Sequence, residues 1–425
     1  MAGPLSGYRI LDLSRAIAGP YGAMILGDLG AEVIKIEPPG GELSRLFPGP
    51  SHEGESFYYL AFNRNKKAIT LDLGTDTGRE AFYDLVAISD VVWDNFRYGV
   101  MERLGADYQT ISKINPKIIS CSISGYGTTG PYVNRPSVDV VVQGIAGTLS
   151  TTGEPGGRPL KPGFPAADIL GGLFGVIAVI AALAQRERTG EGKRIDVELL
   201  GSMMSAMAYE FSYYLCSGIV PGPMGSGHLA LLPYGVYKCK EGYITLGPTW
   251  PRLAKVIGAD WMIDDPRFIK GAERLKHREE FNQAIEEHLA KAPAEDWLEL
   301  FHVEDIIAGP IHTIEKTVAD PQVKARNMIL NLPHPLGGEV KLVGNPIKME
   351  GIKENEYSAP PTQGQHNDEI LKGLLNYSDE KLAKLRDEEK KHAQKLLARL
   401  EKTSMDAALR ILQKESQREA EQQGD

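Results

Sequence analysis

One carboxylate in a long apolar stretch could act as a nucleophile. Asp168 is the only charged residue between Lys161 and Arg186, within the segment GFPAADILGGLFG. Aspartate commonly caps helix N-termini, and we expect a helix that begins at Ile169. Amide groups at that helix end would keep the carboxylate ionised in apolar surroundings. Such a carboxylate can attack a reactive acyl group and form a covalent intermediate, so capping and nucleophilic catalysis are compatible roles.

Other catalytic patterns do not fit the sequence. The loop SRAIAGPYG follows the first expected strand, where a dinucleotide-binding protein would carry GxGxxG. We therefore discount NAD and interpret Glu37, which ends the next strand, as facing water. The nine histidines are scattered, so no metal site is predicted. The chain also lacks the GxxxxGK[ST] phosphate loop and the GxSxG nucleophile elbow.

Composition limits the cellular setting and the partners. The 425 residues include 42% hydrophobic residues and carry a net charge of −9, which argues against general nucleic-acid affinity. Three widely spaced cysteines suit a reducing cytoplasm, and the N-terminus does not resemble a signal peptide. The longest apolar run, residues 169–184, is short for a bilayer span and contains three glycines. We expect it to form a buried helix, with no membrane partner.

Strands and helices alternate in the first part of the chain. We expect strands within residues 8–14, 31–37, 66–73, 90–96 and 117–127, with helices at 21–30 and 77–89 between them. This alternation predicts an α/β fold, a doubly wound, Rossmann-like parallel sheet. Two long helices, 169–188 and 192–217, would follow.

The predicted secondary structure and the charge pattern change after a glycine- and proline-rich link at residues 218–235. The segment KCKEGYITLGP suggests a hairpin, and mixed-charge helices are expected near 250–258, 277–291, 294–302 and 314–326. We predict a large domain (1–215, completed by 335–390), a smaller α+β domain (225–330) and a charged helical tail (391–425).

The chain resembles the family III CoA-transferases, which include formyl-CoA:oxalate and carnitine CoA-transferases and the related 2-methylacyl-CoA racemases. Matching stretches occur in order to about residue 390: PLSGYRILDLSRAIAGPYGAMILGDLGAEVIKIE, NRNKKAITLDL, DVVWDNFRYGVMERLG, SISGYGTTGPY, RERTGEGKRIDVELL, HLALLPYGVYKCKEGYITLG, DDPRF and ADPQVKARNM. The resemblance implies that Asp168 attacks an acyl-CoA thioester and passes through an anhydride and an aspartyl-CoA thioester. A small carboxylic acid then takes the CoA, and no cofactor beyond CoA is required.

The resemblance also implies a set of binding residues. A glycine-rich lid would include Gly225, Gly227 and His228, although a plain linker is the alternative. Two departures from the family pattern affect the expected CoA phosphate contacts: Ser124 replaces a lysine and Pro38 replaces an arginine. The implied CoA-binding residues are Arg15, Ala16, Ile17, Ala18, Leu71, Asn95, Phe96, Arg97, Arg103, Ser124 and Tyr126.

Two alternatives and one assembly also follow from the resemblance. The racemases place a histidine before an aspartate where this chain has Val138-Asp139. Valine cannot titrate, which favours the transferase, and a base at another position is the alternative. Some family members assemble from unlike subunits, one of which lacks the nucleophile. Asp168 argues that this chain is not the subunit without a nucleophile. Binding of a related subunit through the C-terminal tail is the alternative to a homodimer. The resemblance implies an interlocked homodimer. It does not distinguish among the acid substrates of the family.

Overall fold

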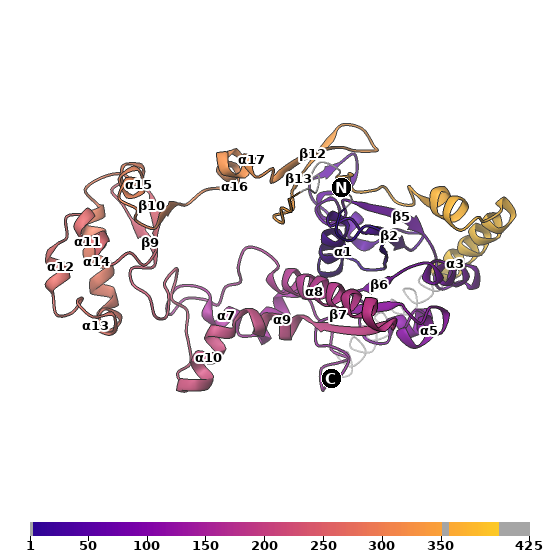
Figure 1. Ribbon diagram of the computed structural model, residues 1–425, viewed down its shortest axis with the longest axis horizontal. Coiled ribbons are helices and arrows are strands. Elements are labelled where there is room, and N and C mark those ends of the chain that lie inside the picture. Colours follow the sequence, from indigo (N-terminus) through magenta and orange to yellow (C-terminus); the bar gives the residue numbers. More distant parts are fainter. Residues whose placement is uncertain (1–2, 351–356, 399–425) are drawn as a thin grey trace, which may run out of the picture. The chain divides into compact units, whose positions relative to one another are not determined.

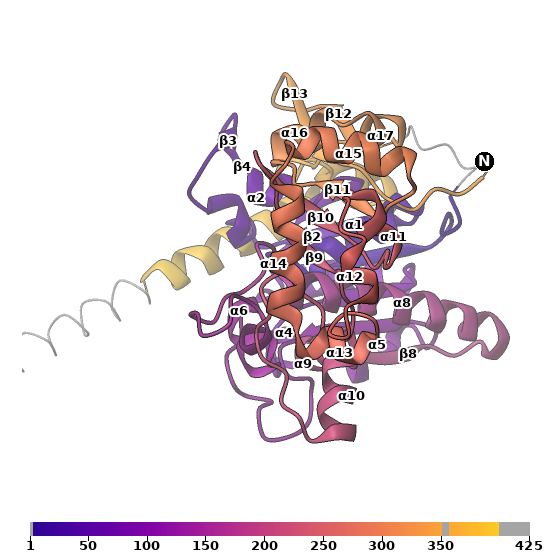
Figure 2. The same ribbon diagram turned by 90° about the vertical axis from the view of Figure 1, so that its left-hand side faces the viewer.

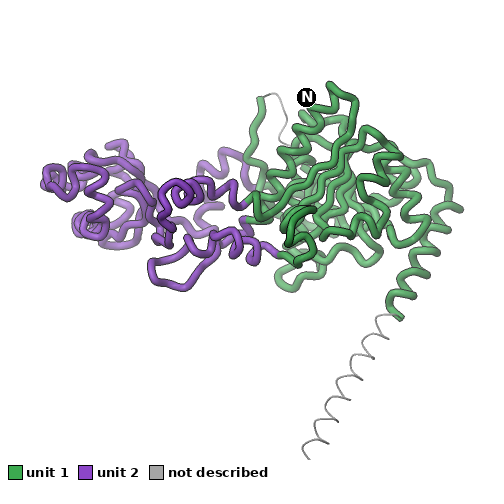
Figure 3. Tube along the Cα trace, turned by 90° about the horizontal axis from the view of Figure 1, so that it is seen from below, with its two compact units in different colours: residues 1–137, 167–202, 330–425 green, residues 138–166, 203–329 purple. Residues whose placement is uncertain are grey.

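The computed structural model describes residues 3–350 and 357–398, which group into two compact units (Figures 1 and 3). Unit 1 comprises residues 1–137, 167–202 and 330–425, and unit 2 comprises 138–166 and 203–329. The division assigns residues 138–166 and 203–215 to unit 2, whereas the sequence placed them in the large domain. The domain boundaries stay a prediction.

Unit 1 is built on a six-stranded parallel sheet with the order β5-β2-β1-β6-β7-β8. The predicted α/β class and parallel sheet are therefore confirmed. The strands are β1 (Arg9–Asp12), β2 (Glu32–Glu37), β5 (Lys66–Thr70), β6 (Val91–Asp94), β7 (Ile119–Ser124) and β8 (Lys193–Glu198). Because all six are parallel, their carboxyl ends meet at one edge of the sheet, where ligands bind in open α/β sheets.

Two helix layers cover the sheet. Helices α1 (Ala18–Asp28) and α8 (Ala166–Thr189) pack through glycines: an added Cβ at Gly22 or Gly175 would lie 2.5 or 2.6 Å from the Trp93 ring. Helix α8 runs along the β7–β8 edge (Figures 1 and 2). Helices α3 (Asp76–Ala87) and α5 (Tyr108–Ile114) supply Phe82 and Ile111 to the core on the opposite face.

Helix α8 is long and apolar enough to cross a membrane by length and composition alone. Half of its most apolar window is nevertheless buried in the protein, and its glycines lie against the sheet and α1. It is a core helix of unit 1, as the sequence predicts.

The predicted second long helix over residues 192–217 is wrong for its first part and is divided in the rest. Lys193–Glu198 forms β8, paired in parallel with β7, and two shorter helices follow, α9 (Leu199–Ala206) and α10 (Ala208–Ser217). Gly192 lies so close to β7 that a Cβ would be 2.1 Å from the Ile118 carbonyl oxygen. Pairing with an existing strand therefore overrides the local helical pattern.

The remaining elements of unit 1 are short. They are η1 (Leu43–Leu46), β3 (Ser51–His52), β4 (Glu55–Ser56), α2 (Phe57–Leu60), α4 (Val100–Leu104), β12 (Ile329–Pro333), β13 (Glu339–Val343) and the π-helix η2 (Glu369–Leu374). A C-terminal helix begins at residue 379 and continues to 398. Of the predicted tail, residues 399–425 lie outside the described residues.

Unit 2 contains a small antiparallel sheet with the order β11-β10-β9. The predicted hairpin is confirmed as β9 (Gly235–Lys238) and β10 (Tyr243–Leu246), and β11 (Ala308–Pro310) adds the third strand. The expected helix near 314–326 is two helices, because Asp320 caps the second one and Pro321 begins it. The helices are α6 (Asp139–Ile145), α7 (Thr148–Thr151), α10, α11 (Arg252–Val256), α12 (Trp261–Asp264), α13 (Gly271–Lys276), α14 (Arg278–Leu289), α15 (Ala294–Val303), α16 (Ile314–Ala319) and α17 (Pro321–Ala325).

Candidate active site

Asp168 is the third residue of α8 and is half-buried. The prediction that it caps a helix starting at Ile169 is wrong, because Ala166 and Ala167 already form the first turn. Alanine is the strongest helix former, so the helix starts earlier than the apolar run indicates. The carboxylate nevertheless lies in the first turn, where the unpaired amides and the helix dipole favour negative charge.

Helix α8 brings Asp168 close to the loop after β1. Gly172, one turn beyond Asp168, packs so tightly that a Cβ would lie 2.6 Å from the carbonyl oxygen of Ala18. Ala18 begins α1 and ends the loop that contains the predicted CoA residues Arg15, Ala16 and Ile17. The carboxylate and this loop are therefore neighbours within unit 1.

The loop after β1 is held by side chains from other strands. Asn95, just after β6, accepts from the Arg15 amide at 2.9 Å and donates to the Arg15 carbonyl at 2.8 Å. The Arg15 guanidinium stacks 4.8 Å above the centre of the Phe96 ring. Ala16 has a φ of 63°, a left-handed conformation that alanine rarely adopts. The structure thus joins Arg15, Ala16, Asn95 and Phe96 in one arrangement.

A cavity of about 480 Å³ opens beside this loop at the carboxyl ends of β1, β2 and β5. The predicted residues Arg15, Leu71 and Phe96 all line it. Its wall combines aliphatic side chains and an aromatic ring with a few charged groups, which suits a planar, partly polar ligand such as adenine. The full lining is Leu13, Ser14, Arg15, Ile36, Glu37, Pro38, Gly41, Glu42, Leu43, Leu46, Leu71, Asp72, Leu73, Gly74, Phe96, Val100 and Leu104.

A second cavity of about 270 Å³ lies at the ends of β6 and β7 and shares Phe96 with the first. It includes the predicted residues Arg97 and Ser124. Its buried carboxylate, Asp94, accepts hydrogen bonds from the Ser122 hydroxyl and, at 3.0 Å, from the Phe96 amide. Burial raises the pKa of Asp94 to about 6, although these hydrogen bonds act in the opposite direction.

The other predicted residues of unit 1 line neither cavity. Ile17 and Ala18 are buried at the start of α1, and Arg103 is exposed on α4. Tyr126 is buried, with its ring edge-on to Tyr132 at 5.6 Å.

The predicted lid residues lie in unit 2. Gly225, Gly227 and His228 line a small hollow of about 100 Å³. The His228 ring stacks on Tyr209, with ring centres 5.6 Å apart, and its carbonyl oxygen accepts from Arg278 at 2.8 Å. Gly225 has a φ of 60°, which glycine adopts readily.

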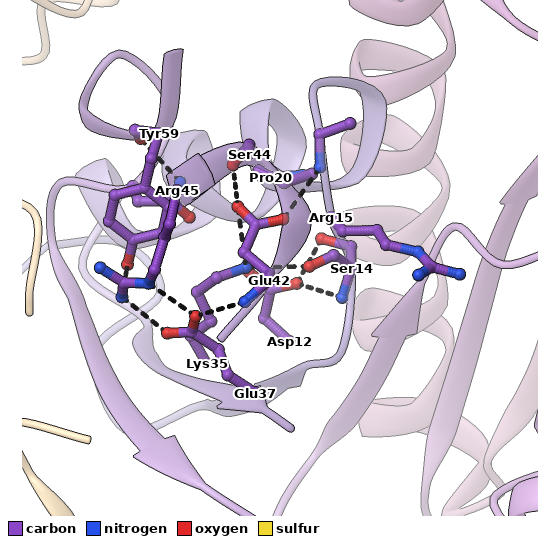
Figure 4. Close-up of polar contacts among 12 residues, drawn as sticks. Asp12, Ser14, Arg15, Pro20, Lys35, Glu37, Glu42, Ser44, Arg45 and Tyr59 are labelled. Carbon is purple, nitrogen blue, oxygen red and sulfur yellow. Dashed lines mark hydrogen bonds and ion pairs between the residues drawn. The ribbon is translucent and has the colours of Figure 1, made fainter. Parts of the chain in front are cut away.

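A buried charge network beneath the loop was missed by the sequence analysis (Figure 4). The Lys66 ammonium donates to Asp12 at 2.9 Å, and the Lys35 ammonium donates to the Ser14 carbonyl at 2.9 Å. Burial lowers the pKa of Lys66 to about 8 against the attraction of Asp12. Burial alone would raise the pKa of Asp12, but the charges of Lys66 and Lys35 lower it. Glu42 accepts from the Ala16 amide at 3.1 Å and completes the support of the loop.

Glu37 belongs to the same buried region, so the interpretation that it faces water is wrong. It is 1% exposed and binds the Arg45 guanidinium through two hydrogen bonds of 2.7 Å. Arg45 also stacks on Tyr59, 3.7 Å from the ring centre. Burial opposes ionisation of Glu37, but Arg45 and Lys35 lower its pKa below the usual value. The partner lies eight residues along the chain, beyond a Pro-Pro-Gly-Gly turn, so strand periodicity carries no signal for the pair.

Within residues 3–350 and 357–398, no group of three or more histidine, cysteine, aspartate or glutamate side chains could hold a metal ion.

Comparisons with known proteins agree on one family. The model of CoA-transferase family III matches residues 5–367. Human succinyl-CoA:glutarate CoA-transferase is 35% identical over 387 residues, covering 90% of this chain and 88% of that protein. Acetyl-CoA:oxalate CoA-transferase of Acetobacter aceti is 36% identical over 358 residues, covering 83% and 90%.

A solved structure shares the fold as well as the sequence. The crystal structure of a CAIB/BAIF family protein from Brucella suis superimposes with a TM-score of 0.78 at 36% identity, covering 88% of this chain and all of that chain. The chain belongs to CoA-transferase family III and is an enzyme that moves CoA between carboxylic acids.

Proposed function

We propose that Asp168 is the nucleophile of this CoA transfer. Its carboxylate attacks the thioester carbonyl of the donor, the carbon–sulfur bond breaks, and CoA leaves as a thiolate. The product is a mixed anhydride between Asp168 and the donor acid. The thiolate then attacks the Asp168 carbonyl, releases the donor carboxylate and forms an aspartyl-CoA thioester.

The second half of the cycle repeats these steps in reverse with the acceptor. The acceptor carboxylate attacks the aspartyl thioester and releases the CoA thiolate, which attacks the acceptor carbonyl of the new anhydride. The new acyl-CoA leaves, and Asp168 returns as a carboxylate. One thioester replaces another, so the cycle consumes neither water nor a further cofactor. Water must stay away from the acylated aspartate, and we propose Gly225, Gly227 and His228 as a lid.

The contact between α8 and the loop after β1 carries this proposal. Asp168 lies one turn from Gly172, which packs on Ala18, and Arg15 of the same loop lines the 480 Å³ cavity. We propose that adenine occupies this cavity near Leu71 and Phe96, and that the pantetheine arm follows the loop toward Asp168. Arg97 and Arg103 would meet phosphates from the exposed surface.

The acceptor is proposed to be a small dicarboxylic acid. Both relatives described above carry the name of a dicarboxylate, glutarate in one and oxalate in the other. The acceptor is identified by incubating the protein and succinyl-CoA or acetyl-CoA with oxalate, glutarate, formate or carnitine. Mass spectrometry of the CoA esters then identifies the products.

The racemase alternative is disfavoured because Val138 stands where the racemases have a histidine base. This residue precedes α6, its side chain is 60% exposed, and it cannot exchange a proton. Incorporation of solvent deuterium at the α-carbon of a branched acyl-CoA would revive the alternative.

The interlocked homodimer also remains a proposal. Ile177 and Ile180 on α8 are 62% and 38% exposed, which a second chain would cover. A cytoplasmic location is proposed because Cys121, Cys216 and Cys239 are all free thiols. Light scattering of the native protein tests the dimer.

The decisive experiment replaces the nucleophile. Asp168→Asn should lose CoA transfer by several orders of magnitude, because no covalent intermediate can form. Asp296→Asn is a matched control, since Asp296 is the exposed third residue of α15 and should retain activity. Hydroxylamine added during turnover should modify the peptide that contains Asp168. Transfer at the normal rate by Asp168→Asn would overturn the assignment.

A further inference from the structure

The C-terminal helix, residues 379–398, contacts the wall of the larger cavity although the family model ends at residue 367. It lies beside α3 at the β5 edge of unit 1, drawn in yellow in Figure 1. Leu382 and Leu385 are each 3% exposed and belong to the same core cluster as Leu71 and Leu73. The helix is therefore packed into unit 1 through its first two turns.

Its next turns bind the segment that lines the cavity. Residues 71–74 line the cavity, and we call this segment the pocket loop. Glu389 accepts from the Asp72 amide at 3.0 Å, and Nδ1 of His392 donates to Oδ2 of Asp72. Glu388 accepts from the Thr77 hydroxyl at 2.9 Å just beyond the loop.

The pocket loop depends on these contacts for its position. The amide of Asp72 follows the last residues of β5 and donates to Glu389 rather than to a neighbouring strand. The second oxygen of Asp72 accepts from the Gly74 amide at 2.8 Å, so its carboxylate joins the loop to the helix. At Gly74 an added Cβ would lie 2.4 Å from Cε1 of His392. The loop and the helix therefore touch without space for another atom.

We propose that the C-terminal helix completes the acyl-CoA site, with Glu389 and His392 as positioning residues that hold the pocket loop against the ligand. This inference rests on the proposed placement of CoA in the cavity. Neither side chain lines the cavity, so they act through Asp72 and Gly74. Residues that bind a ligand are effective only when a second layer of contacts fixes them.

The position of the loop should matter for binding rather than for chemistry. CoA would remain in the site through both half-reactions, whereas Asp168 lies in the first turn of α8, away from the pocket loop in the sequence. Loosening the loop removes binding energy equally from substrate and transition state, which raises KM and leaves kcat unchanged. A merely structural helix would instead lower kcat and the amount of folded enzyme together.

The test compares Glu389→Ala and His392→Ala with Glu380→Ala, an exposed acidic position on the same helix. Each of the first two should raise the KM for succinyl-CoA and the Kd for CoA roughly tenfold, the effect of one lost hydrogen bond. The acceptor KM and kcat should change less than about twofold. Glu389→Gln keeps an oxygen that can accept from Asp72 and should restore most of the affinity.

A steric variant provides a second test that does not remove a hydrogen bond. Gly74→Ala should weaken CoA binding because its Cβ meets His392, and the double variant Gly74→Ala/His392→Ala should bind CoA no more weakly than His392→Ala alone. Unchanged CoA affinity in Glu389→Ala, His392→Ala and Gly74→Ala would overturn the inference. A fall in kcat and melting temperature without a change in Kd would also overturn it.

Failure of this inference is distinguishable from failure of the proposed function. Leu46→Ala removes an exposed side chain that lines the larger cavity and not the second one. If Leu46→Ala weakens CoA binding and the helix variants do not, CoA occupies the larger cavity and only the role of the helix is wrong. If Leu46→Ala has no effect either, the placement of CoA is wrong.

Discussion

The amide of Ala16 donates a hydrogen bond of 3.1 Å to Oε2 of Glu42, and Ala16 has a φ of 63°. A left-handed alanine costs about 1–2 kcal/mol, so a specific contact must favour it. Glu42 is 5% exposed and lies 3.9 Å from the Lys35 ammonium, which compensates its charge. Glu42 therefore fixes the shape of the loop in which Arg15 meets the proposed CoA site.

Glu42→Ala should raise the KM for acyl-CoA by roughly ten- to a hundredfold, because a buried hydrogen bond to a charged acceptor is worth about 1.5–3 kcal/mol. Adding Ala16→Gly should recover part of the loss, since glycine adopts a positive φ without strain. Steady-state kinetics measure both effects. Glu53→Ala, at an exposed hairpin turn, is the control, and an unchanged KM in Glu42→Ala would contradict the role.

Unit 1 should be destabilised when one partner of the buried Lys66–Asp12 pair is removed. Both side chains are fully buried, with the ammonium nitrogen 2.9 Å from the carboxylate. Lys66→Met leaves Asp12 buried beside fewer cations and should lower the free energy of unfolding by about 3–5 kcal/mol. Urea unfolding followed by circular dichroism measures the change.

The neighbouring Lys67 supplies the comparison. Its side chain is 36% exposed and pairs with Glu32 and Glu369. Lys67→Met should cost less than about 1 kcal/mol, because solvent weakens exposed ion pairs. The double variant Asp12→Asn/Lys66→Met should be more stable than Lys66→Met alone. Equal losses in Lys66→Met and Lys67→Met would contradict this explanation.

Asp94 should make stability depend on pH in mildly acidic solution. Its pKa in the folded chain is about 6, above the ordinary value of 3.8. Between these values the folded chain binds more protons than the unfolded chain, so the free energy of unfolding falls as the pH rises. The loss of stability caused by ionising Asp94 is complete above about pH 6.

Asp94→Asn removes that deficit. The free energy of unfolding of Asp94→Asn minus that of the natural chain should therefore be roughly 3 kcal/mol larger at pH 8 than at about pH 4. Urea titrations at the two pH values measure the difference, with Asp76→Asn, whose side chain is 92% exposed, as the control for removing a charge. A difference of the opposite sign would show that Asp94 is stabilised in its ionised form.

The spacing of apolar residues along the chain was enough to predict most strands of the parallel sheet. The apolar segments that became β1, β2, β5, β6 and β7 are separated by helical spacing or turn residues, and this information is local. The isolation of Asp168 in an apolar segment is likewise visible in the sequence. Its capping role was predicted wrongly because the two preceding alanines start the helix before Asp168.

Only the tertiary structure decided which polar residues meet. Residues 193–198 became β8 because β7 offered an unpaired edge, and Glu37 became buried because Arg45 folds back across a turn. Lys66 and Asp12 are 54 residues apart, and Asp72 and His392 are 320 residues apart. The sequence by itself determined five of the six strands of the main sheet, the core helix and the isolated carboxylate, because each depends on neighbours along the chain. The charge network and the pocket loop depend on long-range pairing, since a buried charge is stable only beside a partner that folding brings to it.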